Sequence, residues 1–165
     1  MHYTVGAAAA DVEIDRQTGR IHVKKVVLAV DAGKALNPTL VRGQVTGGVV
    51  QGLATALYEE MRFDSKGRQL NPNFTDYKLP TAMDIPDEIV PILVEVPQPD
   101  GPFGARGVGE HTMIPMAPMI ANAVANAVGV RIRSMPITAE KVALAIARGE
   151  EFVQTWPPTA ASRSC

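Results

Sequence analysis

The sequence contains very little cysteine, almost no net charge and no long apolar run, and each shortage argues against a class of protein. The one cysteine is the last residue, Cys165, so neither a disulfide framework nor a cysteine-ligated zinc or iron–sulfur site is expected. The formal net charge is -1 and no basic run exceeds Lys24-Lys25, so nothing indicates a nucleic acid partner. Apolar runs are interrupted well before the roughly 20 residues that a spanning helix needs. No secretory signal is visible, and we expect a cytoplasmic protein without a membrane partner.

Glycine and proline are abundant instead, with 14 and 13 residues among 165. They lie between well-patterned segments, which predicts a loop-rich unit shaped around a ligand or by contact with another chain. Hydrophobic residues make up 46% and charged residues 20%, a globular profile. The length suits one domain or two small ones. We expect the folded portion to cover residues 1–150 and a flexible tail to follow over residues 151–165.

The apolar patterning predicts a mixture of strands and helices. Alternation up to Ile14, the turn at 15–19 and the run IHVKKVVLAV predict a β-hairpin, with Val26–Val30 as a strand buried on both faces. A shorter hairpin is expected around residues 61–67, and a strand around Ile92–Val96. Helices are predicted from Asn37-Pro38 to about residue 60, over Pro118–Val128, and from a Thr138 cap to Arg148.

The first predicted helix carries glycines at 43, 47, 48 and 52. Each glycine in a helix costs about 1 kcal/mol relative to alanine, which favours another backbone or a ligand lying against that helix. Gln44 and Gln51 are the polar residues among these glycines. The alternative interpretation is that both are solvent-facing amides on a packed helix.

The stretch GPFGARGVGE places several glycines immediately before one carboxylate, Glu110. Backbone freed from side chains can approach a ligand closely, and a lone carboxylate beside such a ligand could serve as a general base. The alternative is an ordinary glutamate in the first turn of the following helix, stabilised by the helix dipole. His111 adjoins the acid, and since adjacent residues rarely face one point, we expect it to have a surface or supporting role.

Together these stretches resemble part of the molybdenum-binding subunit of the xanthine dehydrogenase/aldehyde oxidase family, from its C-terminal portion. The resemblance covers about residues 3–148 and keeps the order of the family's motifs. The motifs are VDAGKALNP, RGQVTGGVVQGLATALYEE, DYKLPTAMDIP, GPFGARGVGE and the pair IANAVANAVG with MPITAEKVALAI. This resemblance implies an α+β fold of β-hairpins and a mixed sheet packed with about three helices, as part of a larger molybdopterin-binding subunit.

The resemblance also implies roles for individual residues. Glu110 would be the general base in the hydroxylation of an aldehyde or N-heterocycle, with water as the oxygen source. Gln44 matches the glutamine that hydrogen-bonds the pterin. The backbone of Gly107, Val108 and Gly109 would line the molybdenum pocket, and Gln51 lies within the same motif as a further cofactor-binding candidate. No side chain of this chain is expected to ligate the metal.

The sequence departs from the family pattern at position 46 and in the segments that do not occur in it. Position 46 is Thr where many relatives have Glu, and the family's remaining cofactor segments, its iron–sulfur cysteines and its flavin domain do not occur in these 165 residues. We therefore expect a molybdenum–molybdopterin cofactor shared with upstream segments, with iron–sulfur clusters and FAD on partner domains or subunits. The isolated chain is expected to be inactive, and its docking face favours self-association.

Two alternatives stay open on the sequence. Relatives of the family oxidise carbon monoxide or reduce an aromatic thioester, and the residues that choose between these substrates lie outside the chain. The other alternative is a catalytically silent structural or interaction fragment. The substrate, the electron acceptor and the dinucleotide form of the pterin are not encoded in these residues.

Overall fold

A β-hairpin opens the fold and confirms the prediction for this region. Strands β1 (Gly6–Ile14) and β2 (Ile21–Asp31) pair antiparallel in a computed structural model that describes residues 3–149. The expected tail over residues 151–165 lies outside the described residues. In the connecting turn the Asp15 carboxylate accepts hydrogen bonds from the backbone of Gln17 and Thr18 at 2.9 and 3.3 Å. Gly19 adopts a φ of +72° there, and a Cβ would lie 2.0 Å from the Ala139 carbonyl oxygen.

Strand β3 (Glu88–Val94) completes a three-stranded sheet in the order β1-β2-β3. It pairs parallel with β2, with Val27 opposite Val90. It begins four residues before the predicted strand and ends two residues earlier, because pairing with β2 selects the stretch that opposes residues 25–31. One antiparallel and one parallel pair make the sheet mixed, as predicted.

Three helices follow the predicted capping signals. Helix α1 (Pro38–Leu57) begins after Asn37, whose side chain accepts from the backbone N–H of Leu40 at 3.1 Å. Helix α2 (Met116–Val128) ends at Gly129, which takes the left-handed conformation at φ +75°. Helix α3 (Ala139–Ala147) is capped by Thr138, whose hydroxyl accepts from the N–H of Lys141 at 3.3 Å. No helix among the described residues is long and apolar enough to cross a membrane.

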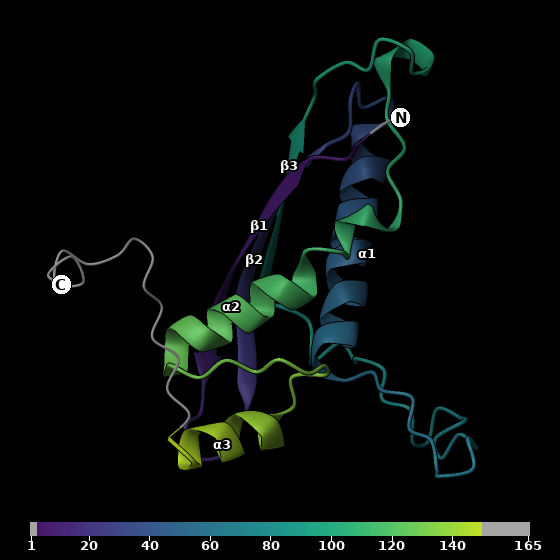
Figure 1. Ribbon diagram of the computed structural model, residues 1–165. Helices are drawn as coiled ribbons and strands as arrows, with labels where there is room; N and C mark the ends of the chain where they lie inside the picture. The colour runs from purple at the N-terminus through teal and green to yellow at the C-terminus, as the bar shows by residue number, and fades with distance from the viewer. Residues whose placement is uncertain (1–2, 150–165) are drawn as a thin grey trace, which may run out of the picture.

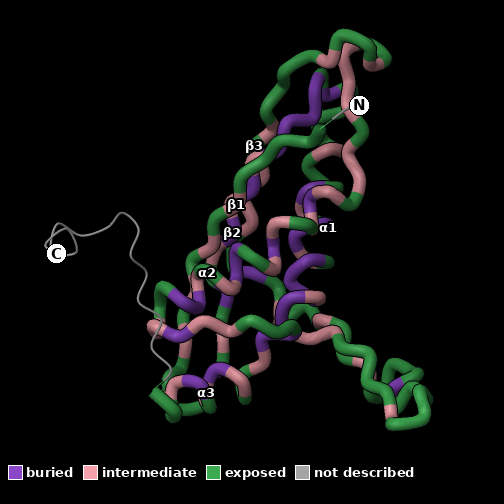
Figure 2. The backbone as a smooth tube through the Cα atoms, in the orientation of Figure 1, coloured by how far each residue is buried: buried purple, intermediate pink, exposed green. Residues whose placement is uncertain are grey.

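The hydrophobic core lies between the sheet and the helices α1 and α2 (Figure 1). Val26, Leu28 and Val30 of β2 are buried there, and Figure 2 shows this burial continuing along α1. Val27 and Ala29, on the opposite face of the same strand, are only half-buried. The prediction that β2 is buried on both faces is therefore wrong for this chain, because the helices cover one face.

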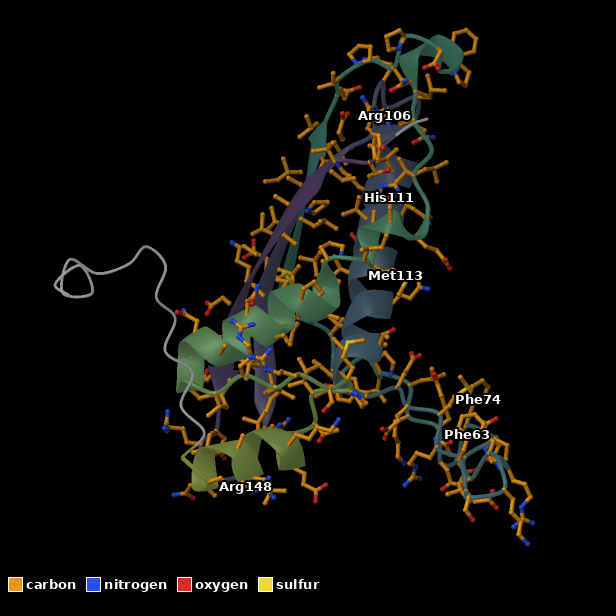
Figure 3. All side chains as sticks on the ribbon, viewed as in Figure 1. Phe63, Phe74, Arg106, His111, Met113 and Arg148 are labelled. Atoms are coloured by element: carbon orange, nitrogen blue, oxygen red, sulfur yellow. The ribbon has the colours of Figure 1, made fainter. Side chains whose placement is uncertain are left out.

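Residues 59–86 form an arm that projects from the end of α1, away from the sheet (Figure 1). The predicted short hairpin is confirmed by a bridge between Phe63 and Gln69. Asn71, only 2% exposed, accepts from the backbone N–H of Arg62 at 2.9 Å. Phe63 and Phe74, labelled in Figure 3, remain 57% and 81% exposed.

The glycines of α1 divide into two pairs. A Cβ at Gly48 would lie 1.8 Å from the Thr112 hydroxyl, and one at Gly52 would lie 2.5 Å from the Met116 side chain. These two positions let the segment before α2 lie against α1. A Cβ at Gly43 or Gly47 would meet nothing within 4 Å. Packing inside the chain therefore explains one pair of glycines and leaves the other pair facing open space.

Alanine substitutions should separate the two pairs. Gly48→Ala is expected to destabilise the protein by about 1–3 kcal/mol, because the new methyl group overlaps buried Thr112. Gly47→Ala is the matched control one residue away, and helix propensity predicts a gain of up to about 1 kcal/mol. Urea unfolding followed by circular dichroism measures both. Equal effects of the two substitutions would contradict the assignment of Gly48 to internal packing.

Candidate functional site

The loop that carries the candidate glutamate is fastened to the end of β2. The backbone N–H of Arg106 donates to the Ala32 carbonyl at 3.0 Å, and that of Lys34 donates to the Gly104 carbonyl at 2.7 Å. Gly33 makes this approach possible because it adopts a φ of +60° and a Cβ would lie 2.5 Å from the Gly104 oxygen. The glycine-rich loop thus begins at a defined place, at the carboxyl end of the central strand.

Asp31, the last residue of β2, holds this junction together. Its Oδ1 accepts from the backbone of Gly33 at 2.9 Å and of Val96 at 3.1 Å, and its Oδ2 lies 3.4 Å from a guanidinium nitrogen of Arg106. Arg106 also donates to the Tyr3 carbonyl at 2.9 Å. Burial raises the pKa of Asp31, but the backbone donors and Arg106 outweigh it, so the pKa lies below its usual value. The sequence analysis missed this role, although an acid closing an apolar strand was visible.

Thr112 fixes the other end of the loop onto α1. Its hydroxyl lies 3.1 Å from the Gly109 carbonyl and 3.5 Å from the Gln44 carbonyl. The side chain is 1% exposed and occupies the space that the missing side chain of Gly48 leaves free. The sequence analysis did not single out Thr112. A small polar residue two positions after the glutamate was the available signal.

Glu110 lies over α1 as a consequence. It begins a short 3-10 turn (Glu110–Thr112), six residues before α2 starts, so it is a first-turn residue of that short turn and not of α2. The side-chain amide of Gln51 donates to Glu110 Oε1 at 3.4 Å. Gln44 precedes Gln51 by two helical turns and therefore faces the same side. The structure thus joins Glu110 to Gln51 and places Gln44 two turns away on the same side of α1.

All three of these side chains are exposed, so the candidate site is an open surface. Gly107 and Gly109 border it, and a Cβ at either position would meet nothing within 4 Å. Val108 is half-buried and contributes to a shallow depression together with Leu36 and Leu40. Open glycines, carboxamides and one carboxylate provide hydrogen-bond donors and acceptors with room for a large polar ligand. This donor set fits a pterin.

His111 supports the loop, and it turns toward the sheet side. Its Nδ1 accepts from the backbone N–H of Gly109 at 3.4 Å. The ring lines a cavity that Leu28 and Pro115 also border, and among residues 3–149 its buried Nε2 has no hydrogen-bond partner. Burial lowers the pKa of His111, which favours the neutral ring that Nδ1 needs in order to accept a hydrogen bond. Figure 3 labels this residue beside the loop.

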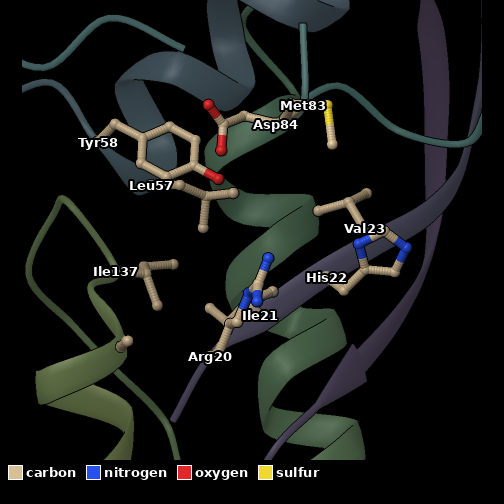
Figure 4. A pocket seen from close by; sticks show the side chains of 10 residues that line it. Arg20, Ile21, His22, Val23, Leu57, Tyr58, Met83, Asp84 and Ile137 are labelled. Carbon is tan, nitrogen blue, oxygen red and sulfur yellow. The ribbon is translucent and has the colours of Figure 1, made fainter. Parts of the chain in front are cut away.

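A separate cavity of about 160 Å³ lies at the far end of α1 (Figure 4). Arg20, Tyr58 and Asp84 line it. Burial of Tyr58 and the charge of Asp84 raise the pKa of the phenol, while hydrogen bonds from Thr81 lower the pKa of Asp84. These contacts attach the arm of residues 59–86 to the body, and we assign the cavity a structural role.

The chain was compared with known families and proteins. A family model described as a molybdopterin cofactor-binding domain matches residues 1–86. The xanthine dehydrogenase molybdenum-binding subunit of Escherichia coli O157:H7 is 38% identical over 138 residues, covering 83% of this chain and 18% of the relative.

Solved structures give the same result. The aldehyde oxidoreductase from Desulfovibrio desulfuricans matches with a TM-score of 0.79 and 37% identity over 86% of this chain. Reconstituted CO dehydrogenase from Oligotropha carboxidovorans matches with a TM-score of 0.80 and 32% identity over 89% of this chain. The chain spans 15% and 18% of the length of these two proteins.

Removing the charge of Asp31 should weaken the loop junction. Asp31→Asn is expected to lower the free energy of unfolding at pH 7 by about 2 kcal/mol, the usual contribution of hydrogen bonds to a charged group. The pKa of Asp31 is lower in the folded state, so its stabilisation is present above the ordinary value of 3.8 and is lost as the pH falls through the folded-state pKa. Urea unfolding at pH 7, 5 and 3 measures this. A difference between wild type and variant that did not shrink at pH 3 would contradict the assignment.

Proposed function

Because the chain belongs to the family of molybdenum-binding subunits of xanthine dehydrogenases and aldehyde oxidoreductases, we propose that it supplies the glutamate side of a molybdopterin site. The proposed reaction is hydroxylation of an aldehyde or N-heterocycle, in which water provides the oxygen and the substrate carbon loses a hydrogen. The observation that carries the proposal is the position of the exposed Glu110 beside Gln51 of α1, on the helix side that also carries Gln44.

Glu110 contributes proton transfer in this proposal. Its Oε1 accepts the Gln51 amide at 3.4 Å, and this contact orients the carboxylate. A carboxylate has a second oxygen, and Oε2 takes a proton from the attacking water as its oxygen approaches the electron-poor carbon. The bound cofactor would supply the redox chemistry, by accepting the electron pair that leaves the substrate.

The other residues of the surface would bind and orient the pterin. The Gln44 amide offers a donor and an acceptor to the polar edge of the pterin. Gly43 and Gly47 on α1, together with Gly107 and Gly109, leave room for close approach, since a Cβ at any of these positions would meet nothing within 4 Å among residues 3–149. Thr112 and Asp31 hold the loop in place through its two ends.

An open surface of this kind is half of a binding site. Most of the length of the relatives has no counterpart here, since the chain spans 18% of the xanthine dehydrogenase subunit. We propose that upstream segments of the molybdenum-binding subunit close the site and that activity requires assembly with them. Iron–sulfur clusters on a partner subunit, and FAD on a further one, would carry the electrons away.

Carbon monoxide is a second candidate substrate. The match to a CO dehydrogenase has a TM-score of 0.80 and covers 89% of this chain, as close as the match to the aldehyde oxidoreductase. An assembled complex that oxidised CO and left aldehydes and N-heterocycles untouched would favour this candidate.

The test uses this chain, tagged and co-expressed with the rest of its molybdenum-binding subunit. We expect close to one molybdenum and one pterin for each copy of the chain. Glu110→Gln should keep both but lose turnover by about 100- to 10,000-fold, the usual contribution of a general base. Metal analysis, pterin fluorescence and steady-state kinetics measure these quantities. The control Glu140→Gln changes an exposed carboxylate at the start of α3 and should alter neither.

Gln44→Ala should give the opposite pattern to Glu110→Gln. Removing the amide takes away hydrogen bonds to the pterin, so cofactor occupancy should fall several-fold while turnover per bound molybdenum changes less. A complex that formed without molybdenum or pterin would contradict the proposal and indicate that the chain is a catalytically silent structural fragment. Full turnover in Glu110→Gln would remove the base assignment alone.

A further inference from the structure

The face of the sheet turned away from α1 and α2 is apolar, and no helix among residues 3–149 covers it (Figure 1). Register places its residues in two complete rows across the three strands. The open face consists of Ala9, Val27 and Val90 in one row and Ala7, Ala29 and Ile92 in the next. Ile92 is 45% exposed, and the alanines of β1 are exposed as well. The two rows therefore consist of small and branched apolar side chains and contain no charged residue.

Such a face is unusual for strands that pair in parallel. All-parallel sheets are found almost only where helices cover both faces, and their strands have continuous apolar runs for that reason. Strand β2 pairs parallel with β3 and has the continuous run VVLAV. An antiparallel sheet with one wet face would show a polar residue at every second position. At positions 27 and 29 the sequence has Val and Ala, so it is suited to a second layer.

Charged residues mark where the apolar face ends. The next row along the strands consists of Asp11, Lys25 and Glu88, and Lys25 Nζ lies 2.7 Å from Glu88 Oε2. At the opposite end Asp31 lies opposite Val94 and is engaged by Arg106. An apolar centre bordered by ion pairs is the composition of a contact surface with a hydrated rim.

We propose that the open face is the docking surface for a helix from the remaining part of the molybdenum-binding subunit. The inference rests on the proposed function, since it takes that subunit as the source of the helix. The occupant follows from two observations: helices are the elements that cover parallel strands, and the chain spans 18% of its relative's length. The alanines let a helix approach closely. Glu110 and Gln51 lie on the side of the sheet that carries α1, so this docking leaves the cofactor surface free.

The test introduces a charge into the centre of the open face. In Ile92→Lys a lysine would be buried under the docked helix, and the amount of subunit remainder captured by the tagged chain should fall at least ten-fold. Ala9→Lys changes the neighbouring row on β1 and should have the same effect. Leu144→Lys is the matched control, because Leu144 is also 45% exposed and lies on α3. Circular dichroism and thermal unfolding of each isolated variant establish that the fold is retained.

The outcomes separate this inference from the proposed function. Capture that survives in folded Ile92→Lys and Ala9→Lys would overturn the docking surface while leaving the molybdopterin site intact. Loss of capture in the Leu144→Lys control to the same extent would also overturn it. The wild-type chain could instead capture no subunit remainder and form a dimer that Ile92→Lys abolishes. That result would overturn the docked helix and assign the open face to a second copy of the chain. Complete capture without molybdenum would refute the proposed function and leave the docking surface standing.

Discussion

The buried carboxylate of Asp31 is the contact on which the arrangement of the candidate site depends. It closes the central strand and accepts hydrogen bonds from two separate segments, at Gly33 and Val96. Arg106 brings the glycine-rich loop to the same carboxylate. A buried charge that lost these partners would be strongly destabilising, so the strand end and the loop are held in one geometry. The place where Glu110 emerges is determined by that geometry and by Thr112.

The glycines of α1 lie on two sides of the helix that have different neighbours. Gly48 and Gly52 allow the segment after the loop to pack against the helix, and this packing carries Glu110 to Gln51. Gly43 and Gly47 have no such neighbour among the described residues, although each lowers the helix propensity. The proposed ligand lying on that side would explain their presence. The same helix is therefore part of the core on one side and presents open glycines, the proposed binding surface, on the other.

The surface of the chain has features expected of a part of a larger subunit. Among residues 3–149, the proposed cofactor surface is open, one apolar face of the sheet has no covering helix, and the arm presents exposed phenylalanines. Each of these features would be a liability for a protein that acted alone. They agree with a chain that spans 18% of the length of its relative.

Local physical chemistry determined much of this fold from the sequence alone. Asn37 and Thr138 cap their helices, Gly129 ends α2, and the alternation before the turn at Asp15 predicts the hairpin, because each depends on residues close in the chain. Glu110 and Gln51 were both visible as candidates. Their contact was decided only by the tertiary structure, since 59 residues separate them. The roles of Asp31 and Thr112, and the single covered face of β2, also depend on segments distant in sequence. Pairing between such segments follows from packing and burial, which no local pattern encodes.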